Sequence, residues 1–500
     1  MSQSRPPQLS FAFADSPQGD GRTEGTDASV PDKRPVHTAS DSRGKESTPR
    51  AADATSQLLE LVCSEENLRR ALAKVVRNDG APGVDRQTVG AVLRSKKRLL
   101  PKLRDALLSG TYVPGDIRRV WIPKPDGGQR GLGIPNVVDR WVQQALLQVL
   151  EPIFEPTFHA SSHGFRPNRG AHTAIAEAAK YVMEGRRYTV DLDLEKFFDR
   201  VDHQRLLDRV GQRVQDRRIL RIVRLMLKAR VVFPDGTRVA TEEGTPQGGP
   251  LSPLLSNVVL DELDRELGRR GLCFVRYADD CNIYVRSERA GKRVMASIRR
   301  FIEKRLKLKV NEAKSAVDLA HRRHFLGFRI GASKKGYLTV QLSRRSVERL
   351  QARLREMTPR NWGSSLERCF ERLNRYLQGW MGYFRLCTCE IRETLHYFDG
   401  HVRRRIRAII VKQKKRSRHL YRHLCRHGAG SGSAWKAAYS RRGIWWKSRS
   451  HGMNTVHDND WFAERLVSLE RLWHHRRYDW RPLWRARPEE PDVRSTSPVL

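Results

Sequence analysis

Two short segments place acidic residues where they could bind metal ions. In residues 188–199, Asp191 and Asp193 alternate with apolar residues, so an extended strand would carry both carboxylates on one face and the apolar side chains on the other. No local cation pairs with either aspartate, and two neighbouring acids raise the pKa of at least one of them unless a cation neutralises the pair. The pattern therefore predicts a strand whose polar face binds a cation.

The second acidic segment, residues 274–285, carries Asp279 and Asp280 between two β-rich runs. This pattern predicts a β-hairpin with both aspartates at its tip. Together the two segments offer the carboxylate oxygens that Mg²⁺ prefers, and two metal ions about 3.5–4 Å apart suit in-line nucleotidyl transfer. Taken singly, each acid could instead cap a turn or pair with an arginine. Asp202 in particular is expected to cap the helix that follows it.

The elements that must position these acids follow from the hydrophobic pattern. From Leu58 to about residue 330, amphipathic helices alternate with short β-rich runs, as in an α+β or α/β domain. From about 346 to 410 strand patterns disappear. Apolar residues there recur at helical spacing between Leu366 and Phe384, which predicts a helical bundle.

Polar and glycine-rich stretches predict the unstructured parts. Residues 1–55 are poor in large apolar side chains and are expected to form a disordered leader. Residues 428–433, a run of Gly, Ala and Ser, are expected to form a flexible linker. We expect residues 483–500 to be a flexible tail.

The overall charge predicts a polyanionic partner. The chain of 500 residues has 95 Lys and Arg against 56 Asp and Glu, a net charge of +39. Nucleic acid is the first candidate, because so large an excess is self-repulsive unless a partner neutralises it. A membrane surface is a weak second candidate. No apolar run reaches the ~18 residues that a spanning helix needs.

The positive charge is densest near the C-terminus. Residues 400–457 contain sixteen Lys or Arg and no Asp or Glu, a density that suits contacts to phosphates. Tryptophans between the charges offer faces on which bases could stack. The residues that we select as RNA-binding candidates are Arg403, Arg404, Arg405, Lys412, Lys414, Lys415, Arg416, Trp445 and Trp446. The alternative is a solvated charged face.

The cysteines and histidines predict neither disulfides nor zinc. The seven cysteines are scattered and never spaced Cys-x-x-Cys, which fits a reducing compartment and a cytoplasmic location. His419, His423 and His427 recur at helical spacing beside Cys425. We disfavour zinc there because no carboxylate accompanies them and glycines follow.

The acidic segments resemble motifs of a known family. Tyr277-Ala-Asp-Asp280 is similar to the Tyr-x-Asp-Asp box of reverse transcriptases, and residues 193–199 resemble their first acidic motif. The resemblance is closest to group II intron-encoded reverse transcriptase/maturases and extends over roughly residues 65–480. Further stretches match in the family's order: residues 80–85, 121–135, 163–174, 245–257, 309–315 and 324–328.

The resemblance implies roles for the acidic and aromatic residues. Asp193 and Asp279 are the expected primary metal ligands, with Asp280 as a near neighbour. Asp191 is the rival of Asp193, which the spacing to residues 197–199 favours. Phe198 would lie where a deoxyribose lacks its 2′-hydroxyl and exclude ribonucleotides; Phe197 is the competing choice, and core packing is the alternative for both.

Further residues are expected at the nucleotide. Lys124 and Arg130 lie on opposite arms of a predicted hairpin and could clamp the triphosphate. Gln247 lies in a Gly-rich segment that can approach a template base, before a helix that we expect Ser252 to cap. Lys314 is expected near the departing pyrophosphate. Solvated charges and ordinary turn chemistry are the alternatives for these residues.

The fold implied by the resemblance is an α+β right-hand polymerase. Its expected parts are a leader at 1–55, fingers and palm at 56–335, a helical thumb or maturase domain X at 336–427, a basic Trp-rich module at 428–482 and a tail at 483–500. The implied reaction is RNA-directed DNA synthesis with two Mg²⁺ ions.

The same resemblance implies the partners. These are group II intron RNA, whose splicing the protein would assist, a DNA target and primer, and deoxynucleoside triphosphates; no membrane is expected, and a homodimer is left open. Because no paired Cys-x-x-Cys is present, we expect no HNH endonuclease and assign the chain to the endonuclease-lacking type.

Overall fold

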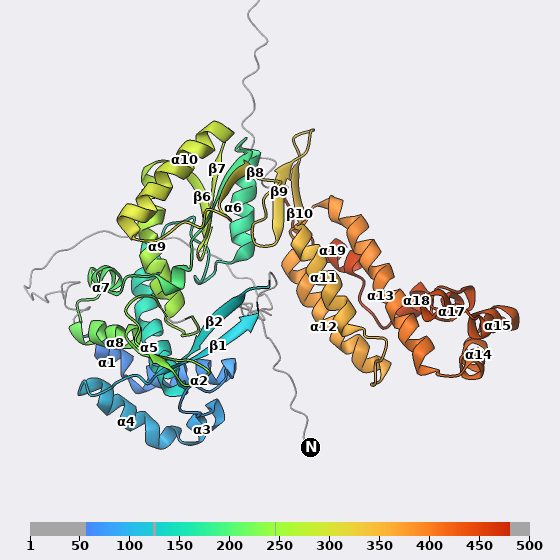
Figure 1. Ribbon diagram of the computed structural model, residues 1–500, viewed down its shortest axis with the longest axis horizontal. Coiled ribbons are helices and arrows are strands. Elements are labelled where there is room, and N and C mark those ends of the chain that lie inside the picture. Colours follow the sequence, from blue (N-terminus) through green and yellow to red (C-terminus); the bar gives the residue numbers. More distant parts are fainter. Residues whose placement is uncertain (1–56, 124–126, 246, 481–500) are drawn as a thin grey trace, which may run out of the picture.

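The computed structural model describes residues 57–123, 127–245 and 247–480. Figure 1 shows a body of helices and sheets from which an elongated helical arm extends. The expected α+β class is confirmed by the order of the elements, because strands occur throughout the body and only helices follow residue 343 in the described chain. The predicted leader and tail lie outside the described residues.

The fingers side of the body combines helices with a small sheet. Its sheet has the order β2-β1-β4-β5, and β1 and β2 form the predicted hairpin. The Trp141 indole is fully buried and donates a hydrogen bond of 2.7 Å to the Leu68 carbonyl, which joins α5 to α2. The elements are α1 (Leu58–Val62), α2 (Glu65–Asn78), α3 (Val89–Arg94), α4 (Lys96–Leu108), β1 (Ile117–Pro123), β2 (Gln129–Ile134), α5 (Val137–Phe154), η1 (Glu155–Thr157), β4 (Val231–Val232) and β5 (Arg238–Val239).

The palm is a four-stranded antiparallel sheet with the order β6-β7-β3-β8. Helix α10 packs on one face of this sheet and α6 packs on the other, as Figure 1 shows. The elements are α6 (Ala171–Met183), β3 (Tyr188–Asp193), η2 (Phe197–Asp199), α7 (His203–Gly211), α8 (Arg217–Leu227), α9 (Ser252–Arg269), β6 (Cys273–Tyr277), β7 (Asp280–Val285), α10 (Glu288–Phe301), η3 (Ile302–Leu306) and β8 (Ala316–Leu319).

Two helix starts test the predicted caps. Asp202 caps α7 as predicted: its carboxylate accepts a 2.8 Å hydrogen bond from the Arg205 backbone N–H. Ser252 is instead the first residue of α9, and the cap position belongs to Leu251. That prediction was wrong by one residue, although the helix begins where the proline pattern places it.

The arm consists of a β-hairpin and a chain of helices. Helices α11 and α12 pack against each other, and α14, α15, α17 and α18 form the far end of the arm in Figure 1. The elements are β9 (Phe328–Ala332), β10 (Leu338–Leu342), α11 (Arg344–Met357), α12 (Leu366–Phe384), η4 (Cys389–Ile391), α13 (Arg392–Gln413), α14 (Ser417–Arg426), α15 (Ser431–Tyr439), α16 (Ile444–Lys447), α17 (His451–Val456), α18 (Asn459–Ala463) and α19 (Leu469–Arg476). The predicted helical bundle is confirmed by α12, which spans the predicted apolar repeat.

The predicted flexible linker at 428–433 was wrong. Helix α15 begins at Ser431, inside that segment, and buries Ala434, Ala437 and Ala438. Small side chains let α15 pack closely on α14 and α17, so tertiary packing overrides the local preference of Gly and Ser for irregular structure.

The last helix returns to the middle of the arm. The buried Asp399 carboxylate on α13 accepts hydrogen bonds from Ser468 Oγ at 2.6 Å and from the Leu469 backbone N–H at 2.8 Å. It thereby satisfies donors at the N-terminus of α19, which the helix cannot satisfy internally. The Trp-rich module and helices α11, α12 and α13 therefore share one hydrophobic core.

Two hydrophobic cores meet at the palm sheet. Val190 and Ile283 belong to the core of the body, whereas Tyr284 belongs to the core that continues into the arm. Around Val190, Ile283 and Tyr284, the sheet is thus covered on both of its faces. No helix in the described ranges is long and apolar enough to cross a membrane.

Candidate active site

Strands β3 and β7 bring the two acidic segments together. Asp193 is the direct cross-strand partner of Asp280, and Asp191 is opposite Asn282. Because directly opposed residues share a face, all of these side chains lie on the same face of the palm sheet. Asp279 lies in the two-residue turn between β6 and β7, as the sequence predicts.

The apolar residues of β3 explain why the aspartates point this way. Val190 is 0% and Leu192 is 1% exposed, and both pack in the body's core. Strand side chains alternate between faces, so burying these residues turns Asp191 and Asp193 to the opposite face. The predicted two-sided strand is confirmed.

Burial and neighbouring negative charges disfavour the ionised forms of Asp279 and Asp280. Burial raises the pKa of Asp280 well above its ordinary value, and the charges of Asp191, Asp279 and Asp193 raise it further. Burial also raises the pKa of Asp279, to which the Asp193 charge adds, while Arg130 opposes the shift. The charged forms of both carboxylates therefore need additional positive charge.

Cations from a distant segment reach the first two aspartates. Asp191 is 8% exposed, and its Oδ2 accepts hydrogen bonds from Arg323 Nε at 2.9 Å and Nη2 at 2.5 Å. Lys314 Nζ lies 3.5 Å from Asp193 Oδ2. Neither partner is local in sequence, in agreement with the prediction that no local cation pairs with these aspartates, because Arg323 and Lys314 lie more than a hundred residues along the chain. Asp191 is committed to an ion pair, whereas Asp193 is one-third exposed.

The donor set fits hard divalent cations by its chemistry. Asp193, Asp279 and Asp280 supply oxygen ligands, the kind that Mg²⁺ takes from proteins. No group of three acidic, His or Cys side chains within the described ranges already converges at metal-binding distances. Lys314 occupies part of the space beside Asp193, so small side-chain movements must accompany metal binding.

The structure distinguishes Phe197 from Phe198. Phe197 is 2% exposed and belongs to the body's core. Phe198 is half-buried and contacts Phe197 edge-on, with ring centroids 5.3 Å apart. The Phe198 carbonyl accepts a 2.6 Å hydrogen bond from the Thr245 N–H. Phe198 is therefore the ring with a face available beside the loop that carries Gln247.

The Gln247 loop is attached to the fingers hairpin. The Gly133 N–H on β2 donates a 2.7 Å hydrogen bond to the Gln247 carbonyl. Gly248 has φ +132°, and a Cβ there would collide with the Gly133 carbonyl. This close approach requires glycine. The half-buried Gln247 thus sits between palm and fingers.

The structure describes only some of the residues that we expect to contact the triphosphate. Arg130 lies opposite Ile122 in the predicted hairpin and is exposed. It is close enough to the palm to affect the Asp279 pKa. Lys124 lies outside the described residues. The Lys314 side chain is 59% exposed, and within the described ranges it is the cation that pairs with Asp193.

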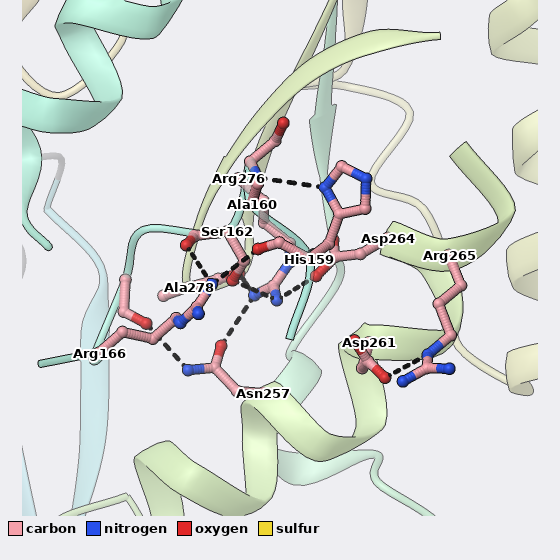
Figure 2. A network of polar contacts seen from close by, with 12 residues as sticks. His159, Ala160, Ser162, Arg166, Asn257, Asp261, Asp264, Arg265, Arg276 and Ala278 are labelled. Carbon is pink, nitrogen blue, oxygen red and sulfur yellow. Dashed lines mark hydrogen bonds and ion pairs between the residues drawn. The ribbon is translucent and has the colours of Figure 1, made fainter. Parts of the chain in front are cut away.

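Sequence reasoning missed Arg276, which lies two residues before the hairpin turn. Its guanidinium is fully buried and forms an ion pair with Asp264 Oδ2 at 2.5 Å. Figure 2 shows it in the middle of a polar network behind the turn. The available signal was a lone arginine between Phe274, Val275 and Tyr277, since arginine is almost never fully buried unless it is paired.

The basic candidates of the arm divide into two groups. Lys412, Lys415 and Arg416 are exposed, whereas the other selected Lys and Arg are half-buried. Arg405 donates to Thr358 Oγ1 at 2.5 Å and to the Thr358 carbonyl at 2.7 Å, which joins α13 to the end of α11. The half-buried selected residues are Arg403, Arg404, Arg405 and Lys414.

Arginines cover the two selected tryptophans. The Arg404 guanidinium carbon lies 5.2 Å from the centre of the Trp445 ring, and that of Arg442 lies 5.0 Å from the Trp446 ring. More freely available aromatic rings occur on α15. Trp435 is 58% and Tyr439 is 45% exposed, and their rings stack with centroids 5.7 Å apart. The alanines of α15 are buried while its aromatic residues face outward, the reverse of an ordinary surface helix.

The histidines at the end of the arm contact each other. His423 Nε2 lies 3.1 Å from His457 Nε2. Burial lowers the pKa of His457 to about 3 and that of His423 to about 4, and nearby positive charges add to both shifts. Both rings are therefore neutral at pH 7.

Comparison with known families identifies two domains. Residues 122–330 match the family model of the reverse transcriptase, an RNA-dependent DNA polymerase. Residues 347–428 match the maturase-specific domain of group II introns. The second match covers α11 to α14, and the first covers the palm sheet and the fingers hairpin except the start of β1.

Individual proteins show the same similarity. Protein YkfC of Escherichia coli is 34% identical over 322 residues, which is 56% of this chain and 84% of YkfC. Group II intron-encoded protein LtrA of Lactococcus lactis is 36% identical over 196 residues, 39% of this chain and 31% of LtrA. Among solved structures, one chain of a partial Cas6-RT-Cas1–Cas2 complex matches at 22% identity and a TM-score of 0.33, with coverage of 49% of this chain and 42% of that chain.

Proposed function

Because this chain belongs to the family of group II intron-encoded reverse transcriptases and maturases, we propose that it copies intron RNA into DNA and assists the splicing of that RNA. It carries both the RNA-dependent DNA polymerase domain and the maturase-specific domain. The observation that carries the proposal is the opposition of Asp193 and Asp280 beside the Asp279 turn, on one face of the palm sheet.

The carboxylates are proposed to hold Mg²⁺ ions. Burial, together with the charges of the neighbouring aspartates, raises the pKa of Asp279 and Asp280, so a divalent cation would relieve an energetic cost that the fold alone imposes. When bound, two such ions would activate the primer 3′-hydroxyl and stabilise the departing phosphates. Asp191 supports this site through Arg323 and is not required as a ligand.

The surrounding residues are proposed to position the nucleotide. Arg130 projects from the fingers and supplies positive charge to the triphosphate. Lys314 moves from Asp193 to the pyrophosphate when the site is loaded, because pyrophosphate carries more negative charge than the single, one-third-exposed Asp193 carboxylate. Phe198 packs against the sugar, and Gln247 faces the base pair. Lys124 would complete the clamp with Arg130.

The arm is proposed to bind the intron RNA. Exposed basic residues on α13 and α14 provide phosphate contacts, and the stacked Trp435 and Tyr439 offer a platform for unpaired bases. Trp445 and Trp446, which arginine side chains cover, are proposed to add to this binding. The polymerase would thereby stay attached to the RNA that it copies.

The test is extension of a DNA primer on an RNA template by the full chain, with Mg²⁺ and each class of nucleotide. We expect templated incorporation of deoxynucleotides and little incorporation of ribonucleotides. An intron-splicing assay on the same preparation checks the maturase role. Protein that binds and splices the intron but never extends a primer would show that only the maturase role is correct.

A further inference from the structure

Arg276 occupies an unusual position for a charged residue. It lies on β6 and is 0% exposed, as is its ion-pair partner Asp264 on α9. Burying a charged pair costs several kcal/mol of desolvation per ion, on the order of what the pairing returns. Such a pair is therefore weak evidence for a role in stability, and its contacts indicate what else it does.

All five N–H donors of the Arg276 guanidinium have an acceptor. Nε and Nη2 donate to the Asp264 carboxylate at 2.7 and 2.5 Å. Nη1 donates to Asn257 Oδ1 at 3.0 Å and to the Ala278 carbonyl at 2.8 Å. The remaining Nη2 proton goes to Ser162 Oγ at 2.8 Å. Figure 2 shows these contacts converging from α9, from the loop around residue 162 and from the hairpin turn.

The contact with Ala278 acts directly on the catalytic turn. The Ala278 carbonyl belongs to the peptide unit that leads into Asp279. Ala278 has φ +58°, a left-handed conformation that is unfavourable for an L-residue. Such a conformation persists only where the surroundings determine it strongly.

A second contact, from the loop at Gly164, also touches this turn. A Cβ on Gly164 would collide with the Ala278 backbone nitrogen, so the loop backbone touches the turn. Asn257 Nδ2 donates a 2.9 Å hydrogen bond to the Gly164 carbonyl. Asn257 therefore binds both the guanidinium and the loop that presses on the turn.

We propose that Arg276, anchored by Asp264, is a positioning residue that fixes the peptide before Asp279 and ties it to α9. The Gln247 loop leads into the same helix α9, so the arrangement keeps the metal-binding turn and the base-pair loop in one rigid unit. Arg276 touches no substrate itself. This inference rests on the proposed polymerase function.

The primary test compares Arg276→Lys with Arg166→Lys in the full chain. Lysine keeps the charge beside Asp264 but cannot reach four partners with one ammonium. Arg166 is a matched control: its side chain is 4% exposed and pairs with Glu155 at 2.8 Å. It also donates to the carbonyls of His159 and Ser162 but not to the turn.

We expect R276K to lower kcat on the order of 100-fold, since small misplacements of a reacting group have this effect. The Mg²⁺ concentration for half-maximal rate should rise, and the increase in melting temperature that Mg²⁺ produces without substrates should shrink. R166K should lower the melting temperature while keeping the wild-type Mg²⁺ dependence. Equal losses of kcat in both variants would overturn the proposal.

If R276K does not fold, the variant Ser162→Ala tests the positioning role of Arg276 instead. It removes one acceptor of the guanidinium and leaves the ion pair intact. We expect a smaller shift of kcat and Mg²⁺ dependence in the same direction; folded S162A with wild-type values of both would overturn the proposal. If the wild type extends no primer, the polymerase function fails, and the Mg²⁺-induced melting shift still decides whether Arg276 positions the turn.

Discussion

Asp193 and Asp280 are direct partners across the antiparallel strands β3 and β7. Asp279 lies in the adjoining turn. Among the described residues, the cation paired with Asp193 is Lys314, whose Nζ lies 3.5 Å from Asp193 Oδ2. The site therefore carries an excess of negative charge, which suits the binding of divalent cations. Each of the following predictions tests one part of this site or of the arm that we propose to bind RNA.

Phe198 should control the choice of sugar. Replacing Phe198 by Ala opens the space that a 2′-hydroxyl would need, and excluding such a group by packing is worth about 1–3 kcal/mol. We expect the preference for deoxynucleotides to fall at least about tenfold in single-nucleotide incorporation. Phe197→Leu is the control, since this buried ring should affect the melting temperature and not the sugar preference. An unchanged preference in F198A would exclude this role.

Lys314 should assist the departing pyrophosphate. Lys314→Ala removes the cation beside Asp193, and we expect kcat/KM for the nucleotide to fall about tenfold, or ~1.4 kcal/mol. Lys309→Ala is the matched control, because Lys309 is an exposed lysine of the same segment. Steady-state kinetics at saturating primer and template measure both. If the two variants behave alike, Lys314 has no specific role.

Trp435 should bind unpaired bases. Stacking of a base on an aromatic ring is worth about 1–3 kcal/mol, so Trp435→Ala should weaken the binding of single-stranded RNA by roughly 5- to 150-fold. Tyr337, 59% exposed on the turn between β9 and β10, gives the control variant Tyr337→Ala. Fluorescence anisotropy at fixed salt concentration measures both. Equal affinities of W435A and wild type would show that α15 does not contact the RNA.

His423 and His457 should make the arm sensitive to acid. Both have a folded-state pKa below the ordinary value of 6.5, about 4 and about 3, so the unfolded chain takes up protons first as the pH falls. The free energy of unfolding is therefore unaffected by these two histidines above pH 6.5 and decreases as the pH drops toward 4. Each histidine lowers it by at most ~1.4 kcal/mol for every pH unit.

Melting curves between pH 7.5 and about 4.5 test this pH dependence. We expect the melting temperature to fall below pH 6.5, and His457→Gln should reduce the slope while a glutamine amide still offers a partner to His423. An identical slope in H457Q and wild type would mean that other groups cause the acid sensitivity.

Local patterns were sufficient to predict much of the site. The alternation in β3 predicts the shared face of Asp191 and Asp193, and the two β-rich runs predict the turn with Asp279. Both signals depend on neighbouring residues in the sequence. The helical repeat of α12 was readable for the same reason.

Long-range partners were not predictable from these patterns. Arg323 reaches Asp191 across 132 positions, and Asp264 lies on a helix that sequence reasoning did not connect to Arg276. The sequence pattern around Phe197 and Phe198 does not distinguish the two rings. Only the tertiary packing shows that Phe197 is the one buried in the body's core. Helix α15 was missed because its Gly and Ser residues favour irregular structure, while burial of its alanines decides the outcome.

The most direct measurement is single-nucleotide extension of a primer on RNA by Asp279→Asn beside Asp318→Asn. Asp318 is an aspartate of the same sheet, on β8 opposite Thr189, and pairs with Arg322 at 3.6 Å. We predict that D279N loses at least about 100-fold in rate while RNA binding stays at the wild-type level, and that D318N stays active. Wild-type extension by D279N would contradict the assignment of the carboxylate site.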